Sequence, residues 1–326
     1  EPIEDFFNSL PALGSGSFDK AEGVMAEKVS FYENIGSADT QGLQEEDYEE
    51  TIALLANKDE YKYNLLLAPG LCSKSHKEMV GNIVNNCQSR GDTMAIIDMV
   101  FWGKSLKEAV KTAKGTDSSY AATYWPWVQT IDPDLGDQVW VPASTMMVGV
   151  YAFNDSSSEA WFAPAGLNRG GMSTVIRAER KLTNGNRDEL YKGNVNPIAT
   201  FPNTGVVVFG QKTLQKKPSA LDRVNVRRLL IELKSYISQV ADNLVFEQNS
   251  AATRNNFLTQ VNPFMESVQQ RQGLYAFKVI MDDSNNTPDV IDRNQMVGQI
   301  FIQPTKTAEF IYLDFNILPT GATFPA

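Results

Sequence analysis

Two residues near the start of a predicted helix have the chemistry that an enzyme would need. Cys72 stands between a short apolar run and that helix, where a helix N-terminus can lower the pKa of a thiol. His76, the only histidine in the chain, follows four positions later. A single histidine completes neither a metal site nor a catalytic pair. We therefore interpret Cys72 as a small buried thiol and His76 as a solvated residue of the first helical turn.

Two further patterns resemble ligand-binding motifs but lack essential residues. WGKS (102–105) resembles the end of a P-loop, but Asp98 occupies the position where the motif needs its first glycine. DDSNNTPDVID (282–292) is rich in carboxylates and amides, yet it lacks the glycine and the terminal glutamate of an EF-hand loop. Asn and Asp before proline favour turns, and we interpret this segment as one. The sequence thus predicts no catalytic residue, no metal and no cofactor.

Composition excludes several other classes of protein. The 326 residues are enough for two domains, and 42% of them are hydrophobic. The net charge of −10 argues against a direct nucleic-acid partner, since binding to phosphates needs a basic face. No apolar run approaches the ~20 residues of a membrane span. Two cysteines are too few for a secreted disulfide scaffold.

The elements that position these residues change in character along the chain. Residues 1–45 are interpreted as a connector and the remnant of a preceding domain. From 46 to 160, apolar runs alternate with amphipathic segments, which predicts parallel strands joined by helices, an α/β domain. The expected helices are 45–57, 75–91 and 105–115, and the expected strands are 63–70, 93–100 and a third beginning at 118.

The second half, residues 161–326, is predicted to be an α+β domain, because its last strands follow one another without intervening helices. The expected elements are a helical stretch within 179–197, a strand at 204–210, helices around 224–240 and 251–270, and strands at 273–282, 295–304 and 308–317. The predicted fold class is therefore α/β plus α+β.

Seven ordered blocks in this second half resemble the C-terminal domain of the tail sheath proteins of contractile-tailed bacteriophages. The blocks are WFAPAGLNRGG (161–171), RDELYKGNVNPI (187–198), GVVVFGQKTL (205–214), LDRVNVRRLLIELK (221–234), LVFEQNSAATRNNF (244–257), NNTPDVIDRNQ (285–295) and FIQPTKTAEFI (301–311). They cover about half of the chain. Members of this family are longer, and a chain that opens at Glu1 without Met is expected to be the C-terminal part of a longer subunit.

The resemblance implies a structural protein rather than an enzyme. Such a subunit polymerises as a helical array of identical copies around the tail tube and contracts to drive the tube through the host envelope for genome delivery. The implied partners are further copies, the tail tube protein, and the baseplate and tail terminator proteins, without membrane insertion. The implied location is the virion, with assembly in the host bacterial cytoplasm. The alternatives are the sheath of a phage-derived bacteriocin or secretion machine, and an α/β enzyme with a site near Cys72.

Within that resemblance we expect two sets of subunit-interface residues before the terminal strand. In the block 161–171, Trp161 and Pro164 would pin the loop, and its glycines would let the backbone approach a neighbour beside Asn168 and Arg169. A domain junction is the alternative interpretation of this loop. In the second set, three cations would form exposed ion pairs that break at low cost. These are Arg223, Arg227 and Arg228.

The last predicted strand, 308–317, is expected to link neighbouring subunits. Ile311, Leu313, Phe315 and Ile317 alternate with polar or aromatic residues and would share one face. A strand at a chain terminus can pair with an open sheet edge of another copy. The alternative is pairing with 295–304 of the same chain. Residues from about 308 onward are therefore a predicted linker strand.

Overall fold

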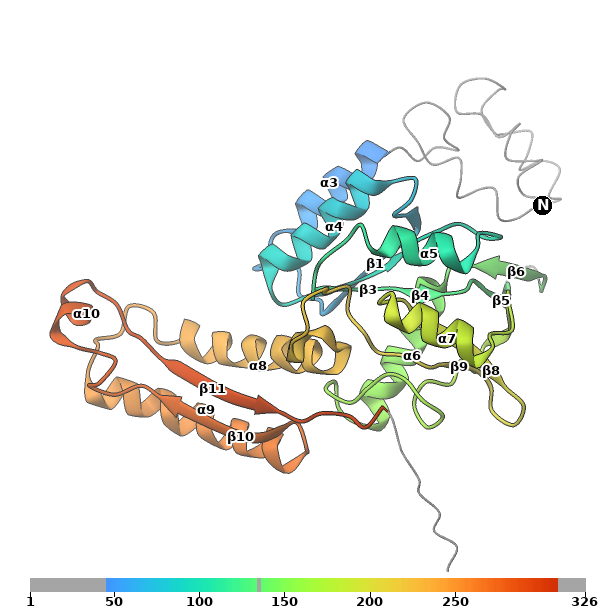
Figure 1. Ribbon diagram of the computed structural model, residues 1–326. Coiled ribbons are helices and arrows are strands. Elements are labelled where there is room, and N and C mark those ends of the chain that lie inside the picture. Colours follow the sequence, from blue (N-terminus) through green and yellow to red (C-terminus); the bar gives the residue numbers. More distant parts are fainter. Residues whose placement is uncertain (1–44, 134–135, 310–326) are drawn as a thin grey trace, which may run out of the picture.

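The computed structural model describes residues 45–133 and 136–309, and its first part is built on a parallel sheet (Figure 1). Strand β1 (Leu65–Cys72), β2 (Met94–Asp98) and β3 (Ala121–Ala122) lie in the order β1-β2-β3 and pair in parallel. Helices α3 (Glu45–Leu55), α4 (Lys77–Arg90) and α5 (Leu106–Ala113) alternate with them. The predicted alternation of strands and helices is confirmed.

Both faces of this sheet are covered. Ala95 and Ile97 pack with residues of α4 and α5, whereas Met94 and Ile96 pack into a second cluster on the opposite face. Successive side chains of a strand point to opposite sides, so a strand buried on both faces is apolar along most of its length. All five residues of β2 are buried, including Asp98.

The second cluster is covered by α6 (Ala143–Ser157), a helix that the sequence analysis did not predict. Asp98 at the end of β2 accepts hydrogen bonds from the backbone N–H of Ser144 (3.2 Å) and from its hydroxyl (2.5 Å). A carboxylate that accepts from the first N–H groups of a helix acts as its N-terminal cap. The cap of α6 comes from a residue 46 positions earlier, which local sequence patterns do not reveal.

Two small sheets complete this part of the chain. Strands β5 (Val128–Ile131), β6 (Gln138–Val141) and β7 (Val175–Ala178) form an antiparallel sheet in the order β6-β5-β7. The segment predicted as helical is a helix only over α7 (Asn184–Lys192), because Gly193 ends it and β8 follows.

The other small sheet crosses the division expected at residue 160. Strand β4 (Tyr124–Trp125) pairs in parallel with β8 (Asn196–Phe201), which pairs antiparallel with β9 (Gly205–Val208). Residues of both halves also share the cluster beneath α6. The chain from 161 to about 214 therefore packs with the α/β part rather than as a separate layer.

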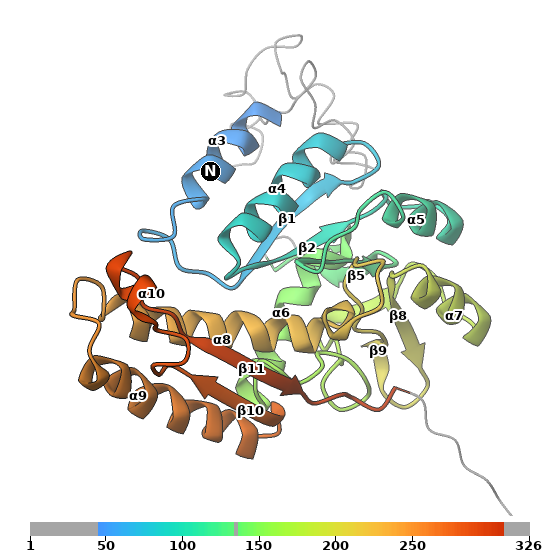
Figure 2. The same cartoon turned by 60° about the vertical axis from the view of Figure 1, so that its left-hand side comes forward.

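The remaining elements form an elongated C-terminal part (Figures 1 and 2). After the short η2 (Ala220–Asp222), helices α8 (Val224–Asp242) and α9 (Ala251–Gln270) pack side by side, with Tyr236 stacked on Phe264 at 3.8 Å between ring centroids. Strands β10 (Leu274–Ile280) and β11 (Gln299–Pro304) form a two-stranded antiparallel sheet against them, and α10 (Pro288–Asp292) lies in their connection. The helices and strands expected within 224–304 are thus confirmed.

Candidate functional site

The loop 161–171 contacts both β9 and the end of α9. Trp161 is 5% exposed, and its indole N–H donates to the carbonyl of Arg271 at the end of α9 (3.0 Å). The Arg271 guanidinium lies 5.0 Å from the Trp161 ring centroid and pairs with Glu159 at 2.8 Å. Pro164 is also buried. These contacts hold Trp161 against the same chain and support the alternative interpretation of a domain junction, whereas a role of the loop at a subunit interface stays a prediction.

Two glycines of this loop lie close to a strand of the same chain. Gly166 has φ of +86° and donates to the carbonyl of Val208 in β9 (2.9 Å). A Cβ added to Gly170 would stand 2.6 Å from that same carbonyl oxygen. Arg169 donates to Ala163 within the loop, at 3.2 Å. Asn168 stays exposed, beside the exposed Leu167.

Two of the three candidate arginines are internal, so the expectation that they are exposed is wrong. Arg227 and Arg228 are each 4% exposed. Arg228 makes a bidentate pair with Asp155 of α6 (2.7 and 2.5 Å). Arg227 donates to Ser119, and its guanidinium lies 3.9 Å from the ring centroid of Tyr120. The start of α8 is enclosed by α6 and by the 118–120 loop, which the helical periodicity of α8 alone does not indicate.

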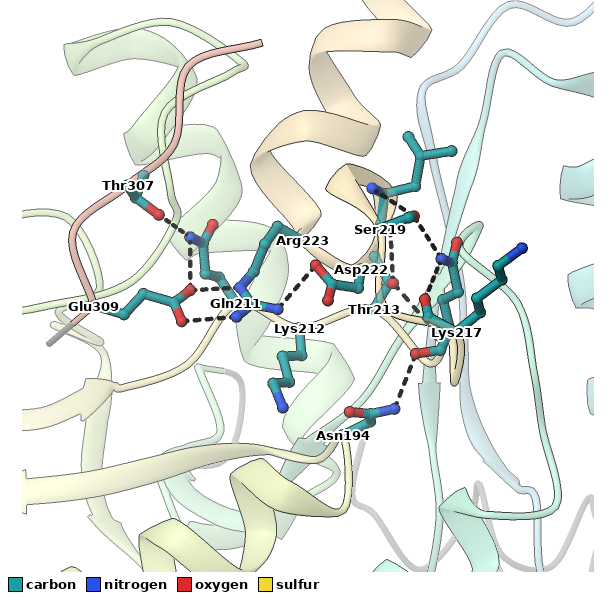
Figure 3. Close-up of polar contacts among 12 residues, drawn as sticks. Asn194, Gln211, Lys212, Thr213, Lys217, Ser219, Asp222, Arg223, Thr307 and Glu309 are labelled. Carbon is teal, nitrogen blue, oxygen red and sulfur yellow. Dashed lines mark hydrogen bonds and ion pairs between the residues drawn. The ribbon is translucent and has the colours of Figure 1, made fainter. Parts of the chain in front are cut away.

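Arg223 belongs to a polar cluster that holds the end of the described chain (Figure 3). Its guanidinium binds the Glu309 carboxylate through two hydrogen bonds (2.7 and 3.0 Å) and pairs with Asp222 at 2.9 Å. Gln211 donates from its amide to Thr307 and to Glu309. We call this set, Gln211, Asp222, Arg223, Thr307 and Glu309, the exit cluster, because the chain continues from it into residues 310–326.

The exit cluster is built on a rigid base. Lys212 and Arg223 form an isolated antiparallel bridge, and the backbone N–H of Val224 donates to Gln211 at 2.8 Å. The fully buried Asn196 of β8 accepts from the Lys212 N–H (2.6 Å) and donates to the Lys212 carbonyl (2.8 Å). The cluster thereby joins β8, the start of α8 and the chain that follows β11.

The neighbouring Lys212 adds a second cation to the exit cluster. With Lys212 included, two cations, Lys212 and Arg223, lie beside two acids, Asp222 and Glu309, so the charges balance only when Glu309 is present. Burial, and then the nearby Arg223, lowers the pKa of Lys212. Burial, and then the Glu309 carboxylate, raises the pKa of Tyr191 well above its usual value. Both pKa shifts indicate that the site is partly shielded from water, where an unpaired charge is costly.

Sequence patterns pointed to Arg223 but not to the other members of the exit cluster, Gln211, Asp222, Thr307 and Glu309. The sequence contains one indication of the role of Glu309. Glu309 stands two residues before Ile311, so in the predicted last strand it lies on the same face as the apolar residues. An acid at that position is unusual for a core-facing residue. The candidates Ile311, Leu313, Phe315 and Ile317 lie outside the described residues, so their pairing stays a prediction.

The residues considered for enzyme chemistry are enclosed. Cys72 is fully buried, and its backbone N–H donates to Nδ1 of His76 at 3.2 Å. His76 is 4% exposed and packs edge-on against Phe101, so the expectation that it is solvated is wrong.

Across residues 45–133 and 136–309, no group of three or more His, Cys, Asp or Glu side chains is arranged to hold a metal ion. In the same ranges no helix is long and apolar enough to cross a membrane.

The fold and the sequence together define the family. Residues 41–214 match the family model described as the phage tail sheath protein central domain, and residues 216–318 match the phage tail sheath C-terminal domain. The chain belongs to the phage tail sheath protein family, which is structural rather than enzymatic. The two matched domains meet near residue 215, after the β4-β8-β9 sheet, whereas the sequence analysis expected a division at residue 160.

Individual relatives agree with this assignment. The chain is 34% identical to the tail sheath protein of Enterobacteria phage T4 over 78% of its own length and 37% of that protein. It is 40% identical to the tail sheath protein of Vibrio phage KVP40 over 57% of its length and 28% of that protein. The chain therefore spans about a third of the length of the curated relatives it matches.

Solved structures share the fold. The sheath complex of an extracellular contractile injection system, PVC, in its contracted state has a TM-score of 0.71 and 25% identity, over 91% of this chain and 80% of that one. The anti-feeding prophage helical sheath in its contracted state has a TM-score of 0.69 and 24% identity, over 90% and 82%.

Proposed function

We propose that this chain is part of a contractile tail sheath subunit that polymerises around a tail tube and shortens to drive the tube through a host envelope for genome delivery. The observation that carries the proposal is the presence, in order, of both tail sheath domains in one chain. The proposed partners are identical copies, the tail tube protein, and the baseplate and tail terminator proteins. The proposed location is the virion, after assembly in the bacterial cytoplasm.

A second candidate is the sheath of a phage-derived injection machine. It is favoured by the similarity in fold to the anti-feeding prophage and PVC sheaths. The relatives of 34–40% identity are named as phage tail sheath proteins, so the phage tail is preferred. Purification of native particles that contain this chain distinguishes the two, because a tail joined to a DNA-filled capsid supports the first and a capsid-free particle supports the second.

Two features support a link between copies through the end of the chain. Among the described residues, β10 and β11 pair only with each other, so each has an outer edge without a strand partner. Unpaired edges expose rows of N–H and C=O groups that accept another strand. The exit cluster fixes the chain at Glu309, immediately before the alternating residues Ile311, Leu313, Phe315 and Ile317. We propose that these residues pair with an open edge of a neighbouring copy.

Deletion of residues 315–326 tests this link. The truncated subunit is expected to fold and to have the same melting temperature as the parent chain. Unlike the parent chain, it is expected not to form long tubes under the electron microscope. A matched control replaces Phe315 and Ile317 with Val, which keeps the apolar face and is expected to preserve tubes. Ordinary tubes from the truncated chain would refute the strand link, whereas a parent chain that never associates would refute the sheath proposal itself.

A further inference from the structure

The loop between α8 and α9 presents a phenylalanine that is not buried against any other described residue. The side chain of Phe246 is 102% exposed, and its neighbour Val245 is 58% exposed. Phe246 also has φ of +71°, in the left-handed region where a bulky side chain crowds its own backbone. Glycine or asparagine would adopt this conformation at lower cost. An exposed aromatic in a strained conformation is a signal of an interaction outside the folded chain.

The loop is held in a fixed position, which suits a docking element. Asn249 donates to the carbonyl of Gln295 at 2.8 Å and accepts from Arg254 at 2.8 Å. Ser250 caps α9 by accepting from the Thr253 N–H at 3.2 Å. Both ribbon views place the loop near α10, at the end of the C-terminal part that is farthest from the central sheet (Figures 1 and 2). The loop that contains Phe246 is therefore at an extremity of the C-terminal part.

The same chain carries a surface that complements this loop. On the outer face of the β10–β11 sheet, Phe301 is 55% exposed. Tyr275, at the irregularity of β10 between Leu274 and Ala276, is 63% exposed. Lys278 stands directly opposite Phe301 in the strand register. The loop has the reciprocal arrangement, because the acids Asp242 and Glu247 flank its apolar tip. Aromatic anchors surrounded by complementary charge are typical of protein interfaces.

We propose that Phe246 is an inter-subunit anchor that docks on the outer β10–β11 face of a second copy of this chain. The two surfaces are different patches of one molecule, so each copy offers a loop to one neighbour and a face to another. Such a heterologous contact continues into an open array instead of closing as a dimer. The proposal rests on the proposed sheath function, and it uses the face of the β10–β11 sheet, leaving its edges available for strand pairing.

The first test replaces Phe246 with glycine in the full chain and compares folding with assembly. The melting temperature of the Phe246→Gly subunit is expected to equal or exceed that of the parent, because backbone strain is relieved. The concentration needed for tube formation is expected to rise at least ~10-fold, as for loss of an interface anchor. Gln272→Gly is the matched control, since exposed Gln272 has φ of +63° and a polar side chain. It is expected to relieve strain without changing assembly.

The second test locates the docking surface by exchanging charges. Glu247→Lys and Lys278→Glu are each expected to weaken assembly, and the double variant is expected to recover at least half of the loss. Tubes from Phe246→Gly at the parent's concentration, or a double variant no better than either single one, would overturn the proposal. Failure of the parent chain to associate at all would overturn the proposed function with it.

Discussion

Replacement of Arg228 by alanine should destabilise the subunit as strongly as a core substitution. The Arg228 side chain is 4% exposed and donates to both carboxylate oxygens of Asp155, at 2.7 and 2.5 Å. Its guanidinium also lies 4.9 Å from the ring centroid of the buried Tyr151. Removal of one partner of a buried ion pair costs about 3–5 kcal/mol, because the other charge loses its compensation. Asp155 is one-third exposed, so the lower end of this range is expected.

At about 2–4 °C of melting temperature per kcal/mol for domains of this size, the expected loss is about 6–12 °C. Arg293→Ala is the matched control, because Arg293 pairs with Asp289 at 2.8 Å with both side chains at least 66% exposed. Such surface pairs contribute about 0–1 kcal/mol. Thermal unfolding followed by circular dichroism and calorimetry compares the two variants. Equal, small shifts for Arg228→Ala and Arg293→Ala would show that the buried pair contributes no more than a surface one.

Two further predictions concern carboxylates, one buried and one partly exposed. Burial raises the pKa of Asp98 to about 6, so the folded chain binds this proton more tightly than the unfolded chain, and the associated stability is present below about pH 4 and lost as the pH rises through 6. Asp98→Asn should remove this pH dependence of the free energy of unfolding and make the variant up to about 3 kcal/mol more stable than the parent chain at pH 7. Denaturant titrations at pH values from 4 to 8 measure this. The same change of unfolding free energy with pH in both chains would contradict the prediction. Glu309→Gln should lower stability by only about 1–2 kcal/mol, because the Arg223–Glu309 pair is partly exposed, yet increase hydrogen exchange at Thr305 and Thr307. Unchanged exchange there would show that Glu309 does not hold the chain.

Periodicity and local signals predicted the regular elements with short connections. Gly91 ends α4 in the left-handed conformation, and Ser105 with Glu108 forms a capping box at the start of α5. The alternation of apolar runs with amphipathic segments predicted the parallel sheet, and the family-like blocks predicted the family. These features are readable because a helix end or a strand face is specified by residues close together in the sequence.

Only the tertiary structure decided which charges are internal and what holds the end of the chain. The spacing of α8 places Arg227 and Arg228 at a polar boundary, but α6 and the 118–120 loop pack over that boundary and enclose both. Glu309 pairs with Arg223, which lies 86 positions earlier in the sequence. Asp98 caps α6 by accepting from Ser144, 46 positions later. The residue types at these positions were visible in the sequence. Their pairing was not, because burial and long-range partners depend on how separately formed elements pack against one another.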